Sequence, residues 1–316
     1  MWYFIIFLFF LILWTRTRFW NRQPMRHIYE LPKYGVLSKP IFNKYCDVIK
    51  VRTATADEVI PYLQSQSNGY EKKMHFMGYL NNAYISTYEN IKGCMTSRKV
   101  NFFYDSRKTA YYHDFIYGDT DAIKRTLFQT HEYNRSLKTK CPISFFSSDF
   151  RIPFLIPVTR YFIHWVKTNS FPKKHEKLVK ATPDTLYTLY EVFKTPMECQ
   201  VTPEIDQISY MMKSKILSIY YYYTTELSAI LFFKNTLCLE NNDSILDWVG
   251  TISLKNESVE NAVSTLLYSF RKIYPIVRIH NISHTPSYHG YKTTENIYYI
   301  YNYGMKRISP KDCLFI

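Results

Sequence analysis

The sequence predicts a mixed α/β (α+β) fold in two similar lobes, each with a mixed, mostly antiparallel sheet flanked by helices. Strand-like and helix-like stretches alternate along the chain, and their coarse order occurs twice, before and after a polar Lys-rich stretch at 166–182. The 30 Tyr and 22 Phe residues favour strands that pack through aromatic side chains. With 316 residues and 47% hydrophobic content, the chain can bury one large or two medium cores. The predicted lobes are 47–175 and 176–316.

The chain begins with fourteen apolar residues, "MWYFIIFLFFLILW", followed by "TRTRFWNR". As a helix this run spans only about 21 Å, against roughly 30 Å of bilayer hydrocarbon. A secretory signal peptide fits poorly, because no basic region precedes the run and no small-residue cleavage site ends it. Arginines on the C-terminal flank and the interfacial Trp14 and Trp20 favour a single-pass membrane anchor at 1–20, with the bulk of the chain in the cytosol. An apolar element of the core is the alternative.

Three prolines, Pro24, Pro32 and Pro40, predict an extended arm over residues 21–46. The stretch "DVIKVRTATADEVIPYLQSQ" then predicts a strand followed by a helix. Thr55 is the expected N-cap of this helix, because acidic residues follow it in the first turn.

An antiparallel meander is expected next, because β-rich runs at 83–88, 91–104 and 110–117 are separated by polar residues. "TDAIKRTLFQTHEYNRSL" has apolar residues at helical spacing, and "CPISFFSS" is typical of a buried strand. His131 and Glu132 are adjacent on the predicted helix, so their side chains point about 100° apart. Because the two side chains cannot both face one substrate atom, the pair is interpreted as structural.

The second lobe is predicted from the same patterns. "TLYTLYEVF" is interpreted as a strand and "TPEIDQISYMM" as a helix. Further strands are expected in "ILSIYYYYTT", "LSAILFFKNTL" and "ILDWVGTISL". "SVENAVSTLLYSFRKI" predicts an amphipathic helix capped by Ser258, and "IVRIH" and "IYYIYNYG" complete the lobe as strands.

The net charge of +14 favours anionic partners such as nucleic acid, acidic lipid headgroups or a polyphosphate ligand. The alternative is that the charges are spread over solvated faces. No run of five Lys or Arg residues occurs, so no specific nucleic-acid partner is expected. The six cysteines have no CxxC spacing and the histidines do not cluster in the sequence, so no metal site is predicted.

Three stretches resemble a known family. "YYHDFIYGDTDAIKRTLFQTHEYNRS" is similar to the central strand, acyl-CoA loop and following helix of the glycylpeptide N-myristoyltransferases, which consist of two GNAT-like lobes. It is most similar to the N-myristoyltransferase-like proteins of large DNA viruses, where a Gln-Thr-His-Glu-Tyr-Asn run occurs on that helix. "GCMTSRKVNFF" resembles the preceding strand, and "HGYKTTENIYYIYNYGMKRISPKDCLFI" resembles the C-terminal region. The resemblance implies a GNAT-like fold and transfer of a fatty acyl group from acyl-CoA (myristoyl-CoA) to an N-terminal glycine amine.

The resemblance also implies roles for individual residues. Backbone N–H groups of Phe115 and Ile116 would stabilise the oxyanion that develops during acyl transfer. The α-carboxylate of Ile316 would accept the proton of the glycine amine. Lys124 and Arg125 would bind the phosphates of acyl-CoA, the co-substrate, and no metal is implied. The expected partners are an N-terminal glycine peptide and, through the anchor, a host-cell or virion membrane.

Departures from the family keep a second interpretation open. The acyl-CoA loop is shorter and carries Asp119 and Asp121, whose charges oppose a phosphate, and the family's Gly-Asp-Gly is absent around Gly290. The alternative is therefore a catalytically inactive member of the fold, acting as a membrane-anchored binding protein or a virion structural protein. An N-acetyltransferase that uses acetyl-CoA is a third interpretation, which fits the chain length less well.

Overall fold

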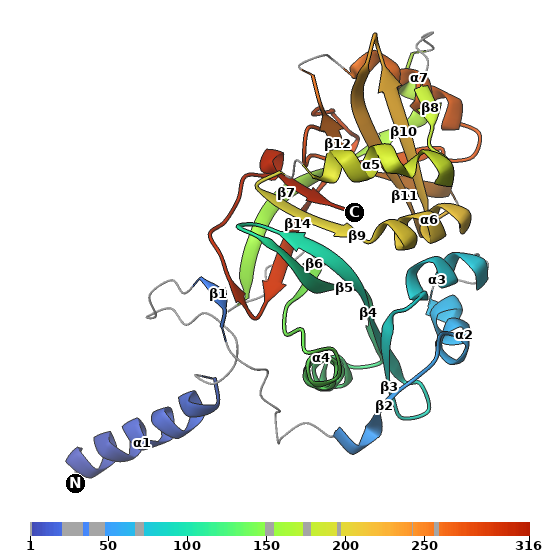
Figure 1. Ribbon diagram of the computed structural model, residues 1–316. Coiled ribbons are helices and arrows are strands. Elements are labelled where there is room, and N and C mark those ends of the chain that lie inside the picture. The colour runs from blue at the N-terminus through green and yellow to red at the C-terminus, as the bar shows by residue number, and fades with distance from the viewer. Residues whose placement is uncertain are drawn as a thin grey trace.

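The computed structural model describes residues 2–20, 34–37, 48–66, 73–148, 155–172, 178–194, 197–241, 243–255 and 259–316 (Figure 1). Its α-helices are α1 (Trp2–Trp20), α2 (Ala56–Gln66), α3 (Lys73–Leu80), α4 (Asp121–Thr139), α5 (Leu186–Phe193), α6 (Ile205–Lys213) and α7 (Glu260–Phe270). Its 3₁₀ helices are η1 (Val48–Lys50), η2 (Thr168–Ser170), η3 (Pro183–Thr185) and η4 (Pro310–Asp312).

The strands of the first half of the chain are β1 (Gly35–Val36), β2 (Val51–Thr53), β3 (Tyr84–Tyr88), β4 (Gly93–Phe103), β5 (Arg107–Gly118), β6 (Ser144–Ser148) and β7 (Ile156–Lys167). Those of the second half are β8 (Leu178–Lys180), β9 (Cys199–Pro203), β10 (Leu217–Tyr223), β11 (Leu227–Glu240), β12 (Asp243–Ser253), β13 (Ile276–His280), β14 (Lys292–Tyr301), β15 (Tyr303–Gly304) and β16 (Cys313–Phe315).

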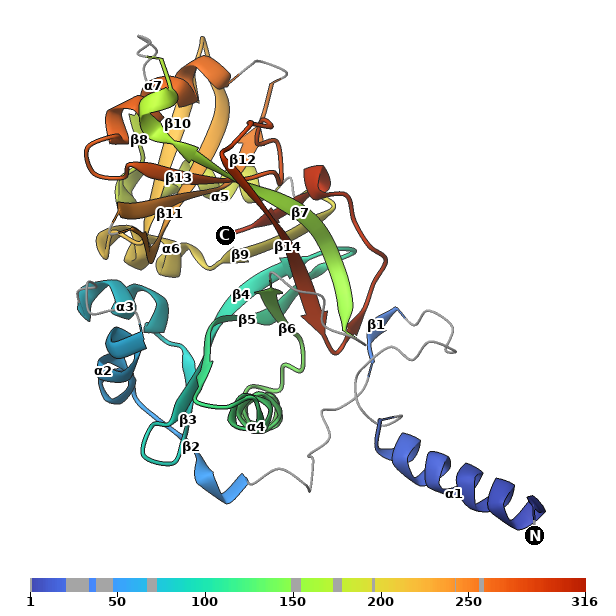
Figure 2. The same ribbon diagram turned by 180° about the vertical axis from the view of Figure 1, so that it is seen from behind.

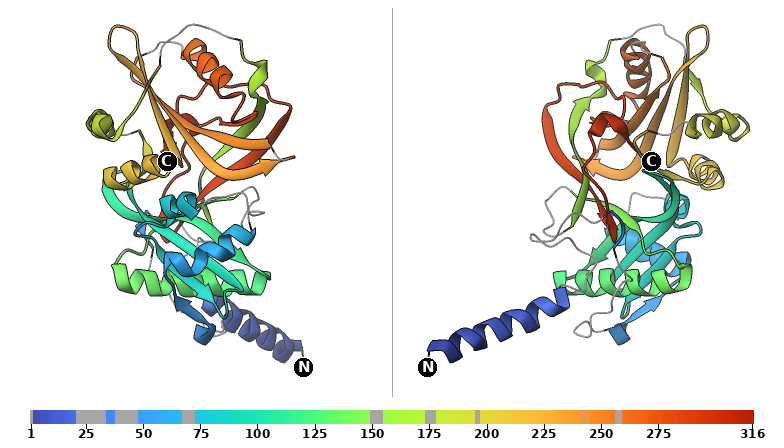
Figure 3. Two further views of the ribbon diagram at one scale, coloured as in Figure 1. Left: turned by 90° about the vertical axis from the view of Figure 1, so that its right-hand side faces the viewer. Right: turned by 60° about the vertical axis from the view of Figure 1, so that its left-hand side comes forward.

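One mixed sheet of fourteen strands runs through the molecule in the order β16-β9-β4-β5-β6-β14-β7-β13-β12-β11-β10-β8, with β2 and β3 attached at β4. Most neighbours are antiparallel, and helices flank the sheet in each half, as the side views in Figure 3 show. Each half contains one parallel β–α–β unit, β5–α4–β6 and β12–α7–β13. The predicted mixed α/β class is thus confirmed, but one continuous sheet takes the place of the separate sheet expected in each lobe, because β14 and β7 connect the strands of the two halves. The boundary between the lobes 47–175 and 176–316 stays a prediction.

Strands from the end of the chain complete the sheet of the first half. β9 pairs with β4, β16 pairs with β9, and β14 lies between β6 and β7. The C-terminus therefore lies in the middle of the molecule, as Figures 1 and 2 show. Phe102 of β4, Phe145 of β6 and Phe315 of β16 share one buried core cluster. Strands from both halves of the chain therefore share this buried core cluster.

Several predicted elements agree with the structure. β3, β4 and β5 form the expected antiparallel meander, and the helix predicted after it is α4. Thr120 caps α4 by accepting a hydrogen bond from the N–H of Ile123, which explains why the helix begins there. Thr55 lies one residue before α2, and its N–H donates to the Glu58 carboxylate.

One prediction for the second half is wrong. "TLYTLYEVF" forms α5 and not a strand, because Leu186, Leu189 and Phe193 recur at helical spacing on one buried face. The polar stretch 166–182 includes the end of β7, which continues to Lys167, and β8, which pairs with β10. Ser258 lies outside the described residues, as does most of the predicted arm.

The predicted membrane anchor is corrected by the structure. α1 has exposed apolar side chains from Trp2 to Ile12, and Figure 1 shows it apart from the sheet. However, none of the helices in the described ranges is both long enough and apolar enough to cross a membrane. The physical reason is the length of the apolar run, which ends at Trp14 and falls short of the hydrocarbon thickness. The single-pass anchor at 1–20, the membrane localisation and the membrane as a partner are therefore not retained.

Candidate active site

β5 and β6 diverge soon after they meet. These parallel neighbours pair only at Tyr111 with Ser144 and at Tyr112 with Phe145. β5 then continues to Gly118 and, among the described strands, pairs only with β4, which lies on its other edge. The edge beyond Tyr112 that faces β6 thus offers backbone polar groups with which a ligand can pair.

A β-bulge lies at this divergence. In the β4–β5 pairing Ser97 faces His113 and Thr96 faces Phe115, so Asp114 is the extra residue. Bulges are common beside active sites, because they turn a side chain in a new direction. Here the bulge turns the Asp114 carboxylate toward two cationic side chains.

Phe115 and Ile116 follow the bulge directly, on the diverging part of β5. Both residues are half-buried. The ring of Phe115 packs against Tyr79 at 5.3 Å and Phe76 at 5.9 Å, measured between ring centroids. Because both side chains are apolar, any contribution that they make to acyl transfer would come from their backbone N–H groups.

Arg98 joins the bulge to the last residue of the sequence. Its side chain is 1% exposed, and its Nε donates to the Asp114 carboxylate oxygens at 2.9 and 3.2 Å. Its Nη2 donates to the main-chain oxygen of Ile316 at 3.0 Å. Ile316 is buried, and its N–H donates to the carbonyl of Val201 on β9. The structure therefore brings Ile316 and the bulge together, although they are far apart in the sequence.

Lys234 reaches the same place from β11. Its Nζ lies 3.8 Å from Oδ1 of Asp114 and 4.8 and 5.9 Å from the ring centroids of Tyr79 and Tyr112. Burial lowers the pKa of Lys234 to about 8, and the charge of Arg98 contributes to the same shift. A lysine of this kind can give up or take a proton near neutral pH.

A second buried polar cluster lies behind the first. The Asp247 carboxylate accepts from Arg278 Nη2 at 2.8 Å and lies 3.2 Å from His280 Nε2. The other ring nitrogen of His280 is 3.3 Å from the hydroxyl of Tyr161, which also accepts from Asn296 at 2.8 Å. Burial alone would raise the pKa of Asp247, but Arg278 and His280 outweigh it and lower that pKa to about 2. Asp247 is thus held in its ionised form by partners within the cluster.

Stacked tyrosines connect the two clusters. The ring of Tyr298 lies 5.4 Å from that of Tyr161 and 6.3 Å from that of Tyr112, and Arg98 lies over the Tyr112 ring at 5.2 Å. Burial raises the pKa of all three phenols, so they stay protonated at physiological pH. These rings therefore pack between Arg98 and the Asp247 cluster, while Lys234 and Asp247 are register partners across β11 and β12.

Lys124 and Arg125 lie on the exposed face of the first turns of α4. Lys124 Nζ is 3.7 Å from the carboxylate of Asp121. α4 starts three residues after the end of β5, so both side chains lie near the diverging edge. The acidic Asp119 and Asp121 occupy the same end of the helix, as the sequence indicated.

His131 and Glu132 lie on the inner face of α4 and are fully buried. Glu132 accepts from Arg135 at 2.9 Å and from Ser144 at 2.7 Å, and His113 Nε2 approaches it to 3.0 Å. Burial alone would raise the pKa of Glu132, but Arg135 and His113 outweigh it and hold that pKa far below its usual range. These contacts tie α4 to β5 and β6, in agreement with the structural interpretation of the pair.

The ligand atoms of His113, His131 and Glu132 lie within 4.8 Å of one another, which the sequence spacing did not suggest. The two histidines come together because one is on β5 and the other on α4. Two of the three residues already have partners, since the His131 nitrogens lie 2.8 and 3.0 Å from serine hydroxyls and Glu132 pairs with Arg135. An Arg so close opposes a cation, so these residues fit an internal network better than a metal.

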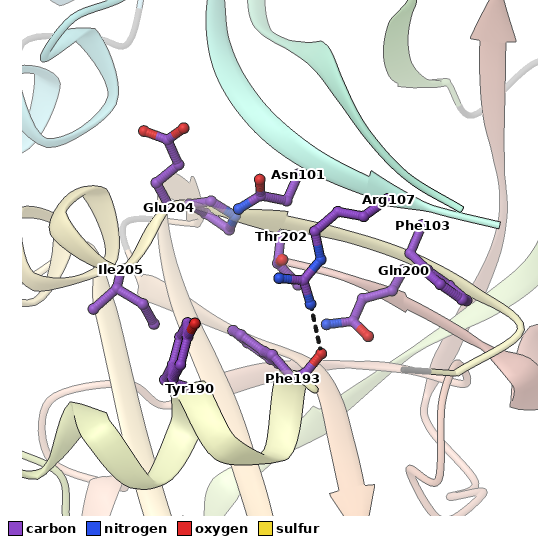
Figure 4. A pocket seen from close by; sticks show the side chains of 10 residues that line it. Asn101, Phe103, Arg107, Tyr190, Phe193, Gln200, Thr202, Glu204 and Ile205 are labelled. Carbon is purple, nitrogen blue, oxygen red and sulfur yellow. Dashed lines mark hydrogen bonds between the residues drawn. The ribbon is translucent and has the colours of Figure 1, made fainter. Parts of the chain in front are cut away.

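A separate pocket of about 200 Å³ lies between the β4–β5 hairpin and β9, α5 and α6 (Figure 4). Figure 4 shows Arg107 donating to the Phe193 carbonyl, at 3.0 Å, with Gln200 beside it. Gln200 and Thr202 are 5% and 3% exposed, and neither side chain has a hydrogen-bond partner among the described residues. The pocket thus has a polar floor and the aromatic walls Tyr190 and Phe193.

Sequence analysis missed Arg98, Lys234 and the Asp247 cluster. The signal was present for Lys234, Asp247 and Arg278, because each stands in a largely apolar strand, as in "LFFKN", "ILDWV" and "IVRIH", whereas Arg98 lies among polar residues in "TSRK". Charged residues are rarely buried without a partner, so such positions point to pairing at the centre of a fold. The sequence does not say which strands lie side by side, so the partners could not be assigned.

No protein-family model matches the chain, and no curated protein sequence does. Solved structures do match. N-myristoyltransferase of Saccharomyces cerevisiae with bound myristoyl-CoA superposes with a TM-score of 0.69 at 10% identity, covering 93% of this chain and 90% of the yeast chain. A probable N-acyltransferase from Enterococcus faecalis has a TM-score of 0.52 at 11% identity, and a GCN5-related N-acetyltransferase from Kribbella flavida has 0.51 at 10%, each covering 79% of this chain and 70% of its own.

At these identities the likeness shows the fold alone. The chain has an acyltransferase-like fold of the GNAT and N-myristoyltransferase type, as the sequence resemblance implied. The finer similarity to viral members of the family remains a sequence-based prediction.

Proposed function

We propose that the protein transfers a fatty acyl group from an acyl-CoA to the amine of an N-terminal glycine. The observation that carries the proposal is the divergence of β5 from β6 at the Asp114 bulge, beside a buried cluster of charges. Support also comes from the fold, which resembles that of a yeast N-myristoyltransferase whose structure contains myristoyl-CoA.

In this proposal the thioester lies along the open edge of β5. The backbone N–H groups of Phe115 and Ile116 stabilise the negative charge that develops on the thioester oxygen. Fixed donors of this type are effective because they need no reorganisation as the charge forms. The phosphates of CoA lie near Lys124 and Arg125, where the amino end of α4 adds a favourable dipole.

The proposed acceptor is a peptide with an N-terminal glycine, whose ammonium must lose a proton before it attacks. The family resemblance assigns this proton to the α-carboxylate of Ile316. Arg98 donates to Ile316 at 3.0 Å, and a guanidinium favours the ionised form of a carboxylate, which makes proton uptake harder.

The alternative function is that of an inactive member of the fold that binds a ligand or a protein without turnover. Asp119 and Asp121 support this alternative, because their charges oppose a diphosphate at the start of α4. The two functions differ in one measurable property, which is binding of a long-chain acyl-CoA.

Calorimetric titration of the full chain with a non-hydrolysable myristoyl-CoA analogue tests the proposal. Free CoA and acetyl-CoA are the matched ligands, and a Lys124→Ala, Arg125→Ala double variant is the matched protein. We expect binding that requires the long acyl chain and weakens at least tenfold in the double variant. Absence of binding to all three ligands at high micromolar concentration would refute the acyltransferase proposal and leave the inactive alternative.

A further inference from the structure

Lys234 is a buried lysine with only a shared counter-ion. Its side chain is 14% exposed, and the carboxylate within ion-pair distance is that of Asp114, at 3.8 Å. Asp114 already receives both of its short hydrogen bonds from Arg98, at 2.9 and 3.2 Å. The positive charge of Lys234 is therefore poorly compensated, which favours its neutral amine form.

Every element packed around Lys234 contributes to this environment. β4 brings the guanidinium of Arg98, β5 brings Asp114 and the ring of Tyr112, and α3 brings the ring of Tyr79. From β12, the carboxylate of Asp247 acts on Lys234 at longer range, while it is itself paired with Arg278. One cation, one paired carboxylate and two aromatic rings thus lie closest to Lys234.

Lys234 also lies next to the backbone groups proposed to bind the thioester. Asp114, which it approaches, immediately precedes Phe115 in the bulge. The Tyr79 ring lies beside both Lys234 and Phe115, at 4.8 Å from Lys234 Nζ and 5.3 Å from the Phe115 ring. The lysine amine therefore lies beside the bulge at which the open edge of β5 begins.

We propose that Lys234, and not the carboxylate of Ile316, accepts the proton from the attacking amine. The inference rests on the proposed acyl transfer. Lys234 belongs to β11, so this role does not require a free α-carboxylate at Ile316.

The proposed step is balanced in atoms and charge. Neutral Lys234 takes one proton from the acceptor ammonium, and the resulting amine nitrogen forms a bond to the thioester carbon. The C–S bond breaks, and CoA leaves as a thiolate that takes the second proton of the attacking nitrogen. Lys234 then releases its proton to water, so one proton is liberated for each amide formed.

A purely structural role for Lys234 explains its largely buried position less well. Arg98 already neutralises Asp114, and an apolar residue at a buried strand position would avoid the cost of burying a charge. Burial lowers the pKa of Lys234 to about 8, close to that of an N-terminal amine, so the proton can pass between them without a large barrier.

The test compares full-length Lys234→Met and Lys234→Arg with Lys180→Met, a control at an exposed lysine on β8. The assay is turnover of myristoyl-CoA and a glycine peptide at saturating peptide from pH 6 to 9.5, with acyl-CoA binding measured in parallel. We expect both Lys234 variants to lose about 100-fold or more in kcat while acyl-CoA still binds. The wild type should show a rise of kcat with pH, which should disappear in both Lys234 variants and persist in Lys180→Met.

A chain extended by one glycine after Ile316 separates the two proton acceptors. We expect this extension to lower kcat by less than tenfold, whereas an acceptor at Ile316 predicts near-complete loss. The inference is overturned if Lys234→Met keeps its kcat and pH profile, or if acyl-CoA binds without any turnover. Failure to bind acyl-CoA at all would instead overturn the proposed function itself.

A readout independent of turnover is the acetylation of Lys234 by acetic anhydride, followed by mass spectrometry. We expect Lys234 to react at pH 8 at least as readily as exposed Lys180, despite its burial, and to be protected by the myristoyl-CoA analogue. A Lys234 that reacts only above pH 10, or that is not protected, would argue against the proposed role.

Discussion

Charged side chains that are largely buried within strands lie at the centre of this molecule. Arg98, Lys234 and Asp247 each have a charged partner on another strand. Buried ion pairs gain little net stability, because desolvation offsets the attraction, but removing one partner costs about 3–5 kcal/mol. Burying such charged residues costs free energy, so their concentration near the open edge of β5 supports a functional site.

His131 makes the stability of the fold sensitive to acid. Burial, together with the charge of His113, lowers the pKa of His131 well below its usual value. Below about pH 6.5 the unfolded chain then binds a proton that the folded chain does not, so stability is lost as the pH falls. We expect His131→Asn to remove up to about 1.4 kcal/mol of this loss per pH unit, as measured by urea unfolding at pH 7.5, 6.5 and 5.5.

The control for this measurement is His289→Asn, at an exposed position. His289 is not part of the buried network around His131, so this variant should change the pH dependence much less than His131→Asn does. Glu132 also has a lowered pKa, so part of the acid sensitivity remains in His131→Asn. An unchanged slope between pH 6.5 and 5.5 in His131→Asn would contradict the assignment to this side chain.

For individual helices and strands, sequence patterns were sufficient to predict the element wherever its hydrogen bonds and burial involve residues close together in the sequence. The β3–β5 meander, α4 and α7 follow from alternation, capping and helical periodicity. α5 was misassigned because "TLYTLYEVF" is rich in β-branched and aromatic residues, while its burial follows a helical period. In this stretch the residue types favour a strand while the spacing of apolar residues favours a helix, and burial of one helical face in the folded chain determined that a helix forms.

The start of α4 depends on one side-chain hydrogen bond. Thr120 accepts from the N–H of Ile123 at 3.3 Å. Thr120→Ala should destabilise the protein by about 1 kcal/mol, because a helix N–H loses its partner. Thr120→Ser keeps the hydroxyl and should recover most of that loss in the same urea titration. Equal stability of wild type and Thr120→Ala would show that this cap is not needed.

For the whole molecule, the sequence could predict the fold class but not the pairing of distant strands. Phe115, Ile116 and Ile316 were placed by resemblance, and the contact that joins Ile316 to the bulge runs through Arg98, which no local pattern identified. The insertion of β14 between β6 and β7 is likewise invisible in a linear pattern. These long-range pairings depend on the packing of the complete chain, so they become apparent only in three dimensions.

Phe315 tests whether the two halves are stabilised together. It is 3% exposed, and its ring stacks on Tyr298 of β14 at 4.0 Å. Phe315→Ala should cost about 3–5 kcal/mol through the lost burial and the cavity left behind. We expect hydrogen exchange to speed up in β4, β9 and β14 together, since all three contribute to the core cluster of Phe315.

Phe162→Ala is the matched control, because Phe162 lies on β7 with 49% of its surface exposed. It should change stability by less than about 0.5 kcal/mol. Faster exchange confined to β16 in Phe315→Ala would mean that the halves are stabilised independently.

The late position of β9 and β16 in the chain has a consequence for biosynthesis. A ribosome adds roughly 5–20 residues each second, so β4 emerges several seconds before β9, which pairs with it, and β9 emerges before its own neighbour β16. Until residues 313–315 leave the exit tunnel, the nascent chain exposes an unpaired strand edge, which is a surface that chaperones bind and that aggregates readily. Translation that stops early should therefore yield a product with most of its strands but without the assembled centre.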